Sequence, residues 1–497
     1  MNDGVMLNAY PDSLGAGLRD TVALLKRPEF RDAFRSFYIL PSLFRSDLDR
    51  GFSVISYDLE PSFATEEDLD ALRGMGIDLK LDFVLNHLSV QSPPFQDLLR
   101  NGDASVYRDF FIDWNRFWSG LGEMGDDGVV RPRPELIRDM FFRKPGLPVL
   151  KVRFPDGTER PYWNTFYQEI RDPAPGETVP RYLGQMDLNL NSPLVWDYYS
   201  ETLDRLAGYG AALVRLDAFA YACKAPGRRN FLNEPGTWDA LERLRVMGEK
   251  RGLTLLPEIH DTYESGTWLK LAKKGYRVYD FFLPGLLIDA LERGNGDRLR
   301  AWAEELRDRK IRTVNMLGCH DGIPLLDLKG ILPEERIAEL TDLIVSRGGK
   351  VKDLHGAKNV YYQVNATYYS ALGADPAKLL LARAIQMFMP GKPQVWYLDL
   401  FAGENDLGAV ARAGAGGHKE INRTNLTAEE AAARSELPIV QRQLELMRLR
   451  NTHPALAEDA ELICGSDDSG GLTLTRRRDG VSLTLRVDLK TLDWEIK

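Results

Sequence analysis

The stretch AALVRLDAFAY, residues 211–221, begins as a hydrophobic β-strand and then places two charged side chains, Arg215 and Asp217, where an apolar core would be expected. Positions i and i+2 of a strand share one face of the sheet, so the guanidinium and the carboxylate are expected side by side. A buried carboxylate is costly unless a partner keeps it charged. The pattern therefore predicts an ionised aspartate at the carboxyl end of an interior strand.

Seven further β-rich runs alternate with helical patterns, which predicts strands in parallel pairing. The eight runs span residues 5–10, 37–41, 79–87, 211–217, 253–260, 277–284, 312–321 and 393–401. Eight strand–helix units are the number in a (β/α)8 barrel. The predicted fold class is α/β, a TIM barrel.

Two long stretches interrupt the alternation. The barrel is predicted over residues 1–87 and 186–435, and residues 88–185, rich in aromatic residues, Pro and Gly, are expected to form an inserted subdomain after strand 3. This subdomain should cover the barrel's C-terminal mouth. A second excursion, 322–375, carries a helix and a loop, and residues 436–497 predict a helix followed by a small antiparallel β domain.

Composition and charge narrow the class of protein. The 497 residues include 44% hydrophobic and 28% charged residues, which is ordinary for a soluble globular protein. The net charge of −9 argues against nucleic-acid binding. No apolar run reaches the roughly 18 residues that span a bilayer, and the N-terminal residues lack the pattern of a secretion signal. Three cysteines without metal-type spacing are expected to be reduced thiols. We expect a cytoplasmic protein.

Acidic and histidine side chains collect at the carboxyl ends of four predicted strands. They are Asp82 with His87, Arg215 with Asp217, Glu258 with His260, and His320 with Asp321. One such residue alone would usually be a cap or part of a turn. Barrel active sites form at this face from the ends of several strands, so four such ends together predict a catalytic site.

Two carboxylates at a barrel mouth suit cleavage of a glycosidic bond, in which one attacks the anomeric carbon and the other protonates the departing oxygen. Arg215 should lower the pKa of Asp217 and keep it ionised as the nucleophile. Glu258 follows the apolar run LTLLP (253–257), where burial should raise its pKa and suit it as the acid/base.

These motifs carry a family resemblance. Four of them resemble the sequence blocks of the α-amylase superfamily (glycoside hydrolase family 13): DFVLNH (82–87), VRLDAFAY (214–221), PEIH (257–260) and CHDG (319–322). Further segments resemble its sucrose phosphorylase subfamily, among them YPDSLG (10–15), RKPGLP (143–148), YYQVNATYYSALG (361–373) and EINRTN (420–425). The similarity runs from about residue 5 to residue 490.

The resemblance implies a retaining glucoside phosphorylase, active as a monomer or homodimer. By position, Asp217 would be the nucleophile, Glu258 the acid/base and Asp321 the transition-state stabiliser. The glucose-binding residues would be Asp49, Phe52, His87, Arg215, His320 and Arg423, with Asp49 and Arg423 as a charged pair that closes the pocket, and His260 would be a further substrate-binding residue. Phosphate would be bound by Arg143 or Lys144, with Tyr362 and Gln363 from a loop.

No cofactor and no metal are expected. The chain has neither a nucleotide-type glycine loop nor a pyridoxal-type lysine signature, and the inserted region lacks an oxygen-rich calcium cage. The implied substrates are an α-glucoside, inorganic phosphate, glucose 1-phosphate and either fructose 6-phosphate or fructose.

The acceptor side departs from the family pattern. GRRNF (227–231) stands where relatives commonly read GTSCF, which adds Arg228 and Arg229. Val360 replaces an aspartate that relatives use on fructose, and loop lysines crowd the same segment, namely Lys350, Lys352 and Lys358. Loss of a carboxylate and gain of cations predict a negatively charged acceptor, so the predicted substrate is sucrose 6-phosphate (sucrose 6F-phosphate).

Other interpretations stay open at this point. The extra cations can be a solvated surface, in which case the substrate is sucrose, glucosylglycerol or glucosylglycerate. The catalytic trio is also shared by α-glucosidases and transglucosidases, which release glucose or transfer it rather than forming glucose 1-phosphate. A sugar-binding barrel without catalysis is the most distant alternative, and the complete set of acids argues against it.

Overall fold

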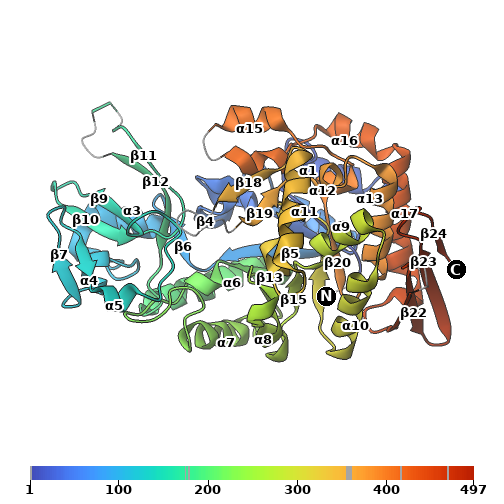
Figure 1. Ribbon diagram of the computed structural model, residues 1–497. Helices are drawn as coiled ribbons and strands as arrows, with labels where there is room; N and C mark the ends of the chain where they lie inside the picture. The colour runs from blue at the N-terminus through green and yellow to red at the C-terminus, as the bar shows by residue number, and fades with distance from the viewer. Residues whose placement is uncertain (1–2, 174, 177–179, 354–360, 415–416, 467–469) are drawn as a thin grey trace.

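A computed structural model describes the whole chain except residues 1–2, 174, 177–179, 354–360, 415–416 and 467–469. Figure 1 shows three parts along the molecule: a segment inserted between β5 and β13 at one end, a barrel in the middle, and the C-terminal strands at the other end. No helix in the described residues is both long and apolar enough to cross a membrane.

The centre is one sheet of eight strands in the order β14-β13-β5-β2-β1-β20-β16-β15, in which every pairing is parallel. The strands are β1 (Met6–Ala9), β2 (Ser36–Ile39), β5 (Asp78–Val84), β13 (Ala211–Asp217), β14 (Thr254–Pro257), β15 (Val278–Asp280), β16 (Thr313–Asn315) and β20 (Lys392–Trp396). Each strand lies within or beside a run that the sequence predicts, so the predicted α/β barrel is confirmed.

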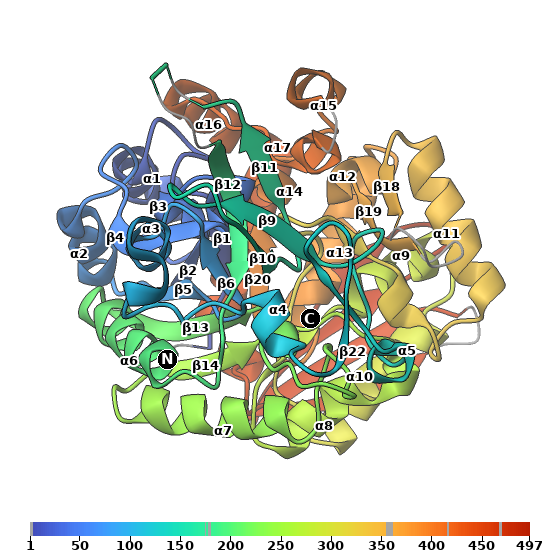
Figure 2. The ribbon, with the colours of Figure 1, turned by 90° about the vertical axis from the view of Figure 1, so that its left-hand side faces the viewer.

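Helices cover the outside of this sheet. Figure 2 looks onto the end that the inserted segment covers, and helices surround the strands on all sides. They include α1 (Leu18–Leu25), α2 (Glu66–Gly74), α6 (Pro193–Gly208), α7 (Gly236–Glu249), α8 (Thr267–Lys273), α9 (Leu283–Arg293), α10 (Asp297–Asp308) and α13 (Pro376–Phe388). Strands covered on both faces read as continuous apolar runs, which explains their sequence.

Three of the predicted strands extend four residues or more beyond the observed carboxyl ends. The run 277–284 enters α9 at Leu283, the run 312–321 leaves the strand after Asn315, and the run 393–401 enters α14 (Tyr397–Leu400). In the first and third runs a buried helical turn follows the strand, and buried helical turns and buried strands are both continuously apolar, so periodicity alone does not separate them. The run 312–321 continues as a largely buried loop instead.

The segment between β5 and β13 has its own pairing and core. Strand β6 (His87–Ser89) pairs antiparallel with β12 (Arg181–Asp187), and β9 (Val149–Arg153) pairs with β10 (Glu159–Trp163). A separate apolar cluster is built on Trp114, Trp118 and Trp163. The domain boundaries that the sequence predicts remain a prediction.

Two further parts follow the barrel order. Between β16 and β20, strand β19 (Tyr361–Asn365) pairs with β17 (Ile323–Pro324) and β18 (Lys350–Asp353), beside α11 (Glu334–Ser346). After α17 (Pro438–Thr452), four antiparallel strands form a C-terminal sheet: β21 (Glu461–Ser466), β22 (Leu472–Arg478), β23 (Val481–Val487) and β24 (Trp494–Ile496). The antiparallel C-terminal sheet is as predicted.

Candidate active site

Asp217 ends β13, and its carboxylate lies beside Arg215, as their spacing predicts. Nη1 of Arg215 lies 2.8 Å from Oδ1 of Asp217 and 2.6 Å from Oδ1 of Asp82. The register of the sheet sets this arrangement, because Arg215 of β13 pairs with Asp82 of β5. Asp82 also accepts a hydrogen bond of 2.8 Å from the hydroxyl of Tyr38. One buried arginine thus joins Asp217 to a fully buried carboxylate.

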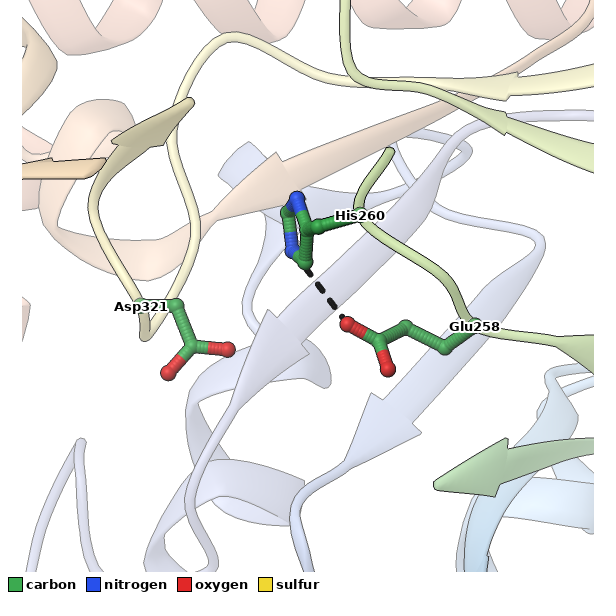
Figure 3. Close-up of side chains that lie close together, drawn as sticks. All are labelled: Glu258, His260 and Asp321. Atoms are coloured by element: carbon green, nitrogen blue, oxygen red, sulfur yellow. Dashed lines mark ion pairs between the residues drawn. The ribbon is translucent and has the colours of Figure 1, made fainter. Parts of the chain in front are cut away.

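Glu258 follows β14 and contacts two cationic groups. Nη2 of Arg215 lies 3.6 Å from Oε1 of Glu258, and Nε2 of His260 lies 3.2 Å from the same oxygen (Figure 3). The other ring nitrogen of His260 lies 3.4 Å from Oδ1 of Asp327. Asp217 and Glu258 therefore contact the two terminal nitrogens of one guanidinium group, which brings both predicted catalytic carboxylates to one site.

Asp321 joins this group from the loop after β16. One ligand atom each of Asp321, Glu258 and His260 lie within 4.8 Å of one another, and Figure 3 shows the two carboxylates pointing toward each other. Burial alone would raise the pKa of Asp321, but contacts with His320, Lys419 and Arg423 outweigh burial and hold that pKa well below its usual value. Asp321 is therefore ionised at neutral pH.

The predicted order of the two catalytic pKa values is wrong for this arrangement. Burial raises the pKa of Asp217 to about 7, and Arg215 offsets burial only in part because its guanidinium also serves other carboxylates. Burial acts on Glu258 too, but Arg215 and His260 outweigh it and lower the pKa of Glu258. Burial lowers the pKa of His260, yet Asp327 and Glu258 together raise it to about 10. The shared proton of the pair thus lies on the Asp217 side, opposite a charged imidazolium.

Phe52 brings together three residues predicted to bind glucose. Its ring is stacked on that of His320, with centroids 5.3 Å apart, and the guanidinium carbon of Arg215 lies 5.5 Å from the Phe52 ring centroid. The backbone oxygen of Phe52 lies 3.0 Å from Nε2 of His87 and accepts a hydrogen bond of 3.2 Å from Gln185. Burial lowers the pKa of His87 to about 4, so this ring is neutral at pH 7.

A strained turn before Phe52 presents Asp49. The φ angles of Asp49, Arg50 and Gly51 are 53°, 46° and 108°. A Cβ on Gly51 would lie 2.1 Å from the backbone nitrogen of Ser42, so glycine is required there. Non-glycine residues in the left-handed region are costly and concentrate at functional sites.

Arg423 lies at the same end of the site but does not form the predicted ion pair with Asp49. Its Nη2 lies 3.6 Å from Oδ1 of Asp321, and its Nε donates a 2.8 Å hydrogen bond to the backbone oxygen of His320. Asp49 pairs instead with Lys419, whose Nζ lies 3.8 Å from Oδ1 of Asp49 and 3.3 Å from Oδ1 of Asp321. Lys419 and Arg423 lie close together in one segment of the sequence, and no pattern there indicates which of the two pairs with Asp49.

The two cations predicted to bind phosphate have different surroundings. The guanidinium carbon of Arg143 lies 5.1 Å from the ring centroid of Phe166, and that ring lies 5.2 Å from the ring of His87. Lys144 donates a hydrogen bond to the amide oxygen of Asn164, and burial lowers its pKa to about 8. The ring of Phe166 therefore lies between Arg143 and His87, a residue predicted to bind glucose, whereas Lys144 is bound within the inserted segment.

The loop residues are described only in part. Gln363 is buried, and its amide nitrogen lies 3.2 Å from Nε2 of His260, which places β19 beside the group of Glu258, His260 and Asp321. The side chain of Tyr362 falls outside the described residues, as do the side chain of Lys352 and all of Lys358 and Val360.

Arg228 and Arg229 are both exposed. Neither side chain forms an ion pair or hydrogen bond with another residue in the described part of the chain. The backbone nitrogen of Gly227 donates a 3.1 Å hydrogen bond to Leu136 of the inserted segment, so this loop is fastened beside the insertion rather than at the catalytic carboxylates.

Comparison with known proteins agrees with this geometry. The chain is 56% identical over 496 residues to a sucrose 6(F)-phosphate phosphorylase of Ilumatobacter coccineus, covering 98% of this chain and 94% of that protein. The chain belongs to the sucrose phosphorylase family. A sucrose phosphorylase of Streptococcus mutans, another member of the family, is 33% identical over 493 residues, with 98% and 95% of the two chains covered.

Solved structures place the fold in the same group. The crystal structure of sucrose 6F-phosphate phosphorylase from Thermoanaerobacter thermosaccharolyticum matches with a TM-score of 0.88 at 35% identity, covering 100% of this chain and 95% of that one. An α-amylase from H. orenii, 17% identical with a TM-score of 0.67, shares the fold alone. No family model matches the chain.

Two residues of the site are not predicted from the sequence. Asp327 and Lys419 sit on segments without a strand-end pattern, and only the tertiary structure brings them to His260 and Asp321. The close grouping of Glu258, His260 and Asp321 has the residue types of a metal site. A metal ion there would have to displace the proton that His260 carries, since its pKa is about 10.

Proposed function

We propose that this chain is a retaining α-glucoside phosphorylase that converts sucrose 6F-phosphate and inorganic phosphate into α-glucose 1-phosphate and fructose 6-phosphate. The proposal depends on one observation above all: Asp217 and Glu258 contact the two terminal nitrogens of Arg215, with Asp321 beside Glu258. Two carboxyl groups with one shared proton at a barrel mouth suit double displacement at a sugar carbon.

In the first displacement, an oxygen of ionised Asp217 attacks the anomeric carbon of the glucosyl group. The bond to the acceptor oxygen breaks, Glu258 transfers its proton to that oxygen, and fructose 6-phosphate leaves. This step requires the shared proton on Glu258, although the charge of His260 holds it on the Asp217 side before substrate binds. The ionised carboxylate of Asp321 stabilises the positive charge that develops at the anomeric carbon.

In the second displacement, an oxygen of inorganic phosphate attacks the anomeric carbon of the glucosyl–Asp217 ester, from the face opposite Asp217. Glu258, now ionised, accepts the proton of the attacking phosphate, and Asp217 leaves as a carboxylate. Two inversions at the same carbon retain the α configuration of the product. Phosphate competes with water for the intermediate, so the acceptor side needs cations. Arg143 is the candidate, because its guanidinium carbon lies 5.1 Å from the ring centroid of Phe166, and that ring lies 5.2 Å from the ring of His87.

The acceptor assignment has two supports. The sequence replaces a family aspartate by Val360 and adds cations around it, and the relative that is 56% identical is named a sucrose 6(F)-phosphate phosphorylase. The family also includes the sucrose phosphorylase of S. mutans at 33% identity and a glucosylglycerol phosphorylase of Marinobacter adhaerens at 32% identity. Fructose and glycerol are therefore the acceptors against which fructose 6-phosphate is to be compared.

The test is an acceptor panel in the synthetic direction. Wild-type protein receives glucose 1-phosphate with fructose 6-phosphate, fructose, glycerol or glycerate, and phosphate release is measured for each. We expect fructose 6-phosphate to be preferred in kcat/KM, because its phosphate is recognised by cations. Equal or better use of fructose would refute the acceptor assignment, and release of glucose without any acceptor dependence would refute phosphorolysis itself.

A further inference from the structure

A lysine that no family motif assigns lies between two carboxylates of the glucose subsite. Lys419 belongs to the 3₁₀ segment η8 (Gly417–Asn422), and its side chain is 25% exposed. Its Nζ lies within ion-pair distance of both Asp49 and Asp321, at 3.8 and 3.3 Å. These two carboxylates come from segments far apart in the chain, and the ammonium group of Lys419 is their common partner.

The backbone around Lys419 is fastened to the loop that carries the catalytic residues. Asn422 donates a 2.8 Å hydrogen bond to the backbone oxygen of Cys319. Arg423 donates one of 2.8 Å to the backbone oxygen of His320, and the backbone oxygen of Ile421 accepts one of 2.9 Å from Asp406. Ile421 and Asn422 are buried. The position of the lysine is therefore set by the same contacts that hold the loop after β16.

The charge of Lys419 matters most for Asp49. In the part of the chain that the structure describes, Lys419 forms the one ion pair of Asp49, whereas Asp321 also contacts His320 and Arg423. Without the ammonium group, two carboxylates would face each other with one of them unpaired. Like charges at short range repel, so the carboxylate of Asp49, at the tip of a strained turn, would move away from the sugar.

We propose that Lys419 is a positioning residue of the glucosyl subsite: by bridging Asp49 and Asp321, it holds both carboxylates where they accept hydrogen bonds from hydroxyl groups of the glucosyl ring. This inference rests on the proposed function, since it concerns the glucosyl group of the same reaction. It does not concern the acceptor, so its effect is the same for transfer to phosphate and transfer to water.

The test uses α-glucosyl fluoride and its four monodeoxy analogues (2-, 3-, 4- and 6-deoxy), with fluoride release as the readout. Lys419→Met removes the charge at similar length, and Lys419→Arg keeps it. The matched control is Lys378→Met, because Lys378 is also partly buried and pairs with Glu292 at 2.7 Å outside this group. Thermal unfolding of each variant establishes that it folds.

We expect Lys419→Met to lower kcat/KM for α-glucosyl fluoride about tenfold, as for a lost hydrogen bond to a charged group. The loss should shrink to about twofold or less for at least one deoxy donor, because a hydroxyl group that is absent has no hydrogen bond to lose. Lys419→Arg and Lys378→Met should stay close to wild type. An equal loss for all four deoxy donors, or no loss for the parent donor, would overturn the inference. If Lys419→Met does not fold, Lys419→Arg decides instead: a kcat/KM that falls by the same factor for every donor would also overturn the inference.

This outcome is separable from that of the proposed function. A wild-type protein that releases fluoride but never forms glucose 1-phosphate would refute phosphorolysis, and the deoxy pattern would still decide the role of Lys419. Conversely, normal phosphorolysis with an unchanged Lys419→Met variant would overturn the inference alone.

Discussion

The positive charge of His260 lowers the pKa of Glu258, so His260 should set the pH range in which the first displacement is active. The imidazolium, with a pKa of about 10, lies 3.2 Å from Oε1 of Glu258. Two unit charges at this distance interact by about 5 kcal/mol at an effective dielectric constant of 20 and by about 1.3 kcal/mol in water. Replacing His260 by Asn removes this interaction, so the pKa of Glu258 should rise by about one to four units.

The sign of the effect on activity follows from the mechanism. Glu258 must be protonated to release the acceptor, and the pair holds its shared proton up to about pH 7, the pKa of Asp217. The kcat/KM of wild type for the donor should therefore fall as pH rises above about 7. In His260→Asn the pair keeps its proton to higher pH, so this fall should move upward by about one unit or more.

The assay is kcat/KM for sucrose 6F-phosphate between pH 7 and pH 10, where the phosphate of the substrate is already a dianion. In a double displacement this ratio reports the first step and is independent of the attacking phosphate. His453→Asn, outside the catalytic group at the end of α17, is the control. An unchanged basic limb in His260→Asn, with kcat/KM lowered equally at every pH, would refute the electrostatic role and leave His260 a packing residue.

Three further outcomes are expected. Asp82→Asn weakens the charged hydrogen bonds that this buried carboxylate accepts from Tyr38 and Arg215, so it should lower the free energy of unfolding by about 2 kcal/mol in urea titrations, whereas an unchanged midpoint would contradict its role in the network. Gly51→Ala would bring a Cβ to 2.1 Å from the backbone of Ser42, so both the melting temperature and kcat/KM should fall, and a variant with wild-type values in both would contradict the required turn. Gln363→Ala should reduce phosphorolysis more than hydrolysis, as measured by glucose 1-phosphate and glucose formed in parallel, and an equal loss of both would remove it from the acceptor side.

Much of the fold, and the grouping of the three predicted catalytic carboxylates, could be predicted because both follow from local patterns. The strand alternation predicts the barrel, and Asp217, Glu258 and Asp321 follow strand ends that a parallel barrel must bring to one face. The pKa order could not be predicted this way. It depends on how many carboxylates share Arg215 and on His260 facing Glu258, and both are facts of tertiary packing.

The same limit explains the pairing of Asp49. Spacing shows that Lys419 and Arg423 lie in one segment, but the direction of each side chain depends on the hydrogen bonds that Arg423 makes to the loop after β16. Arg423 is thereby turned toward Asp321, and Lys419 is left to bridge Asp321 and Asp49. Motif matching finds the residues of such a site more readily than it finds their partners.

The charges of the barrel interior explain why one proton stays available to the catalytic pair. Arg215 is 3% exposed and contacts Asp82, Asp217 and Glu258 together. A single positive charge cannot neutralise three carboxylates, and Asp82 has the shortest contact, at 2.6 Å. The remaining two therefore cannot both be ionised at low cost in a buried site, so they share a proton. If Asp82 were absent, Arg215 would be free to hold Asp217 ionised more strongly. Asp82 thus raises the pKa of Asp217 by competing for Arg215, and the catalytic pair keeps the proton that the departing sugar needs.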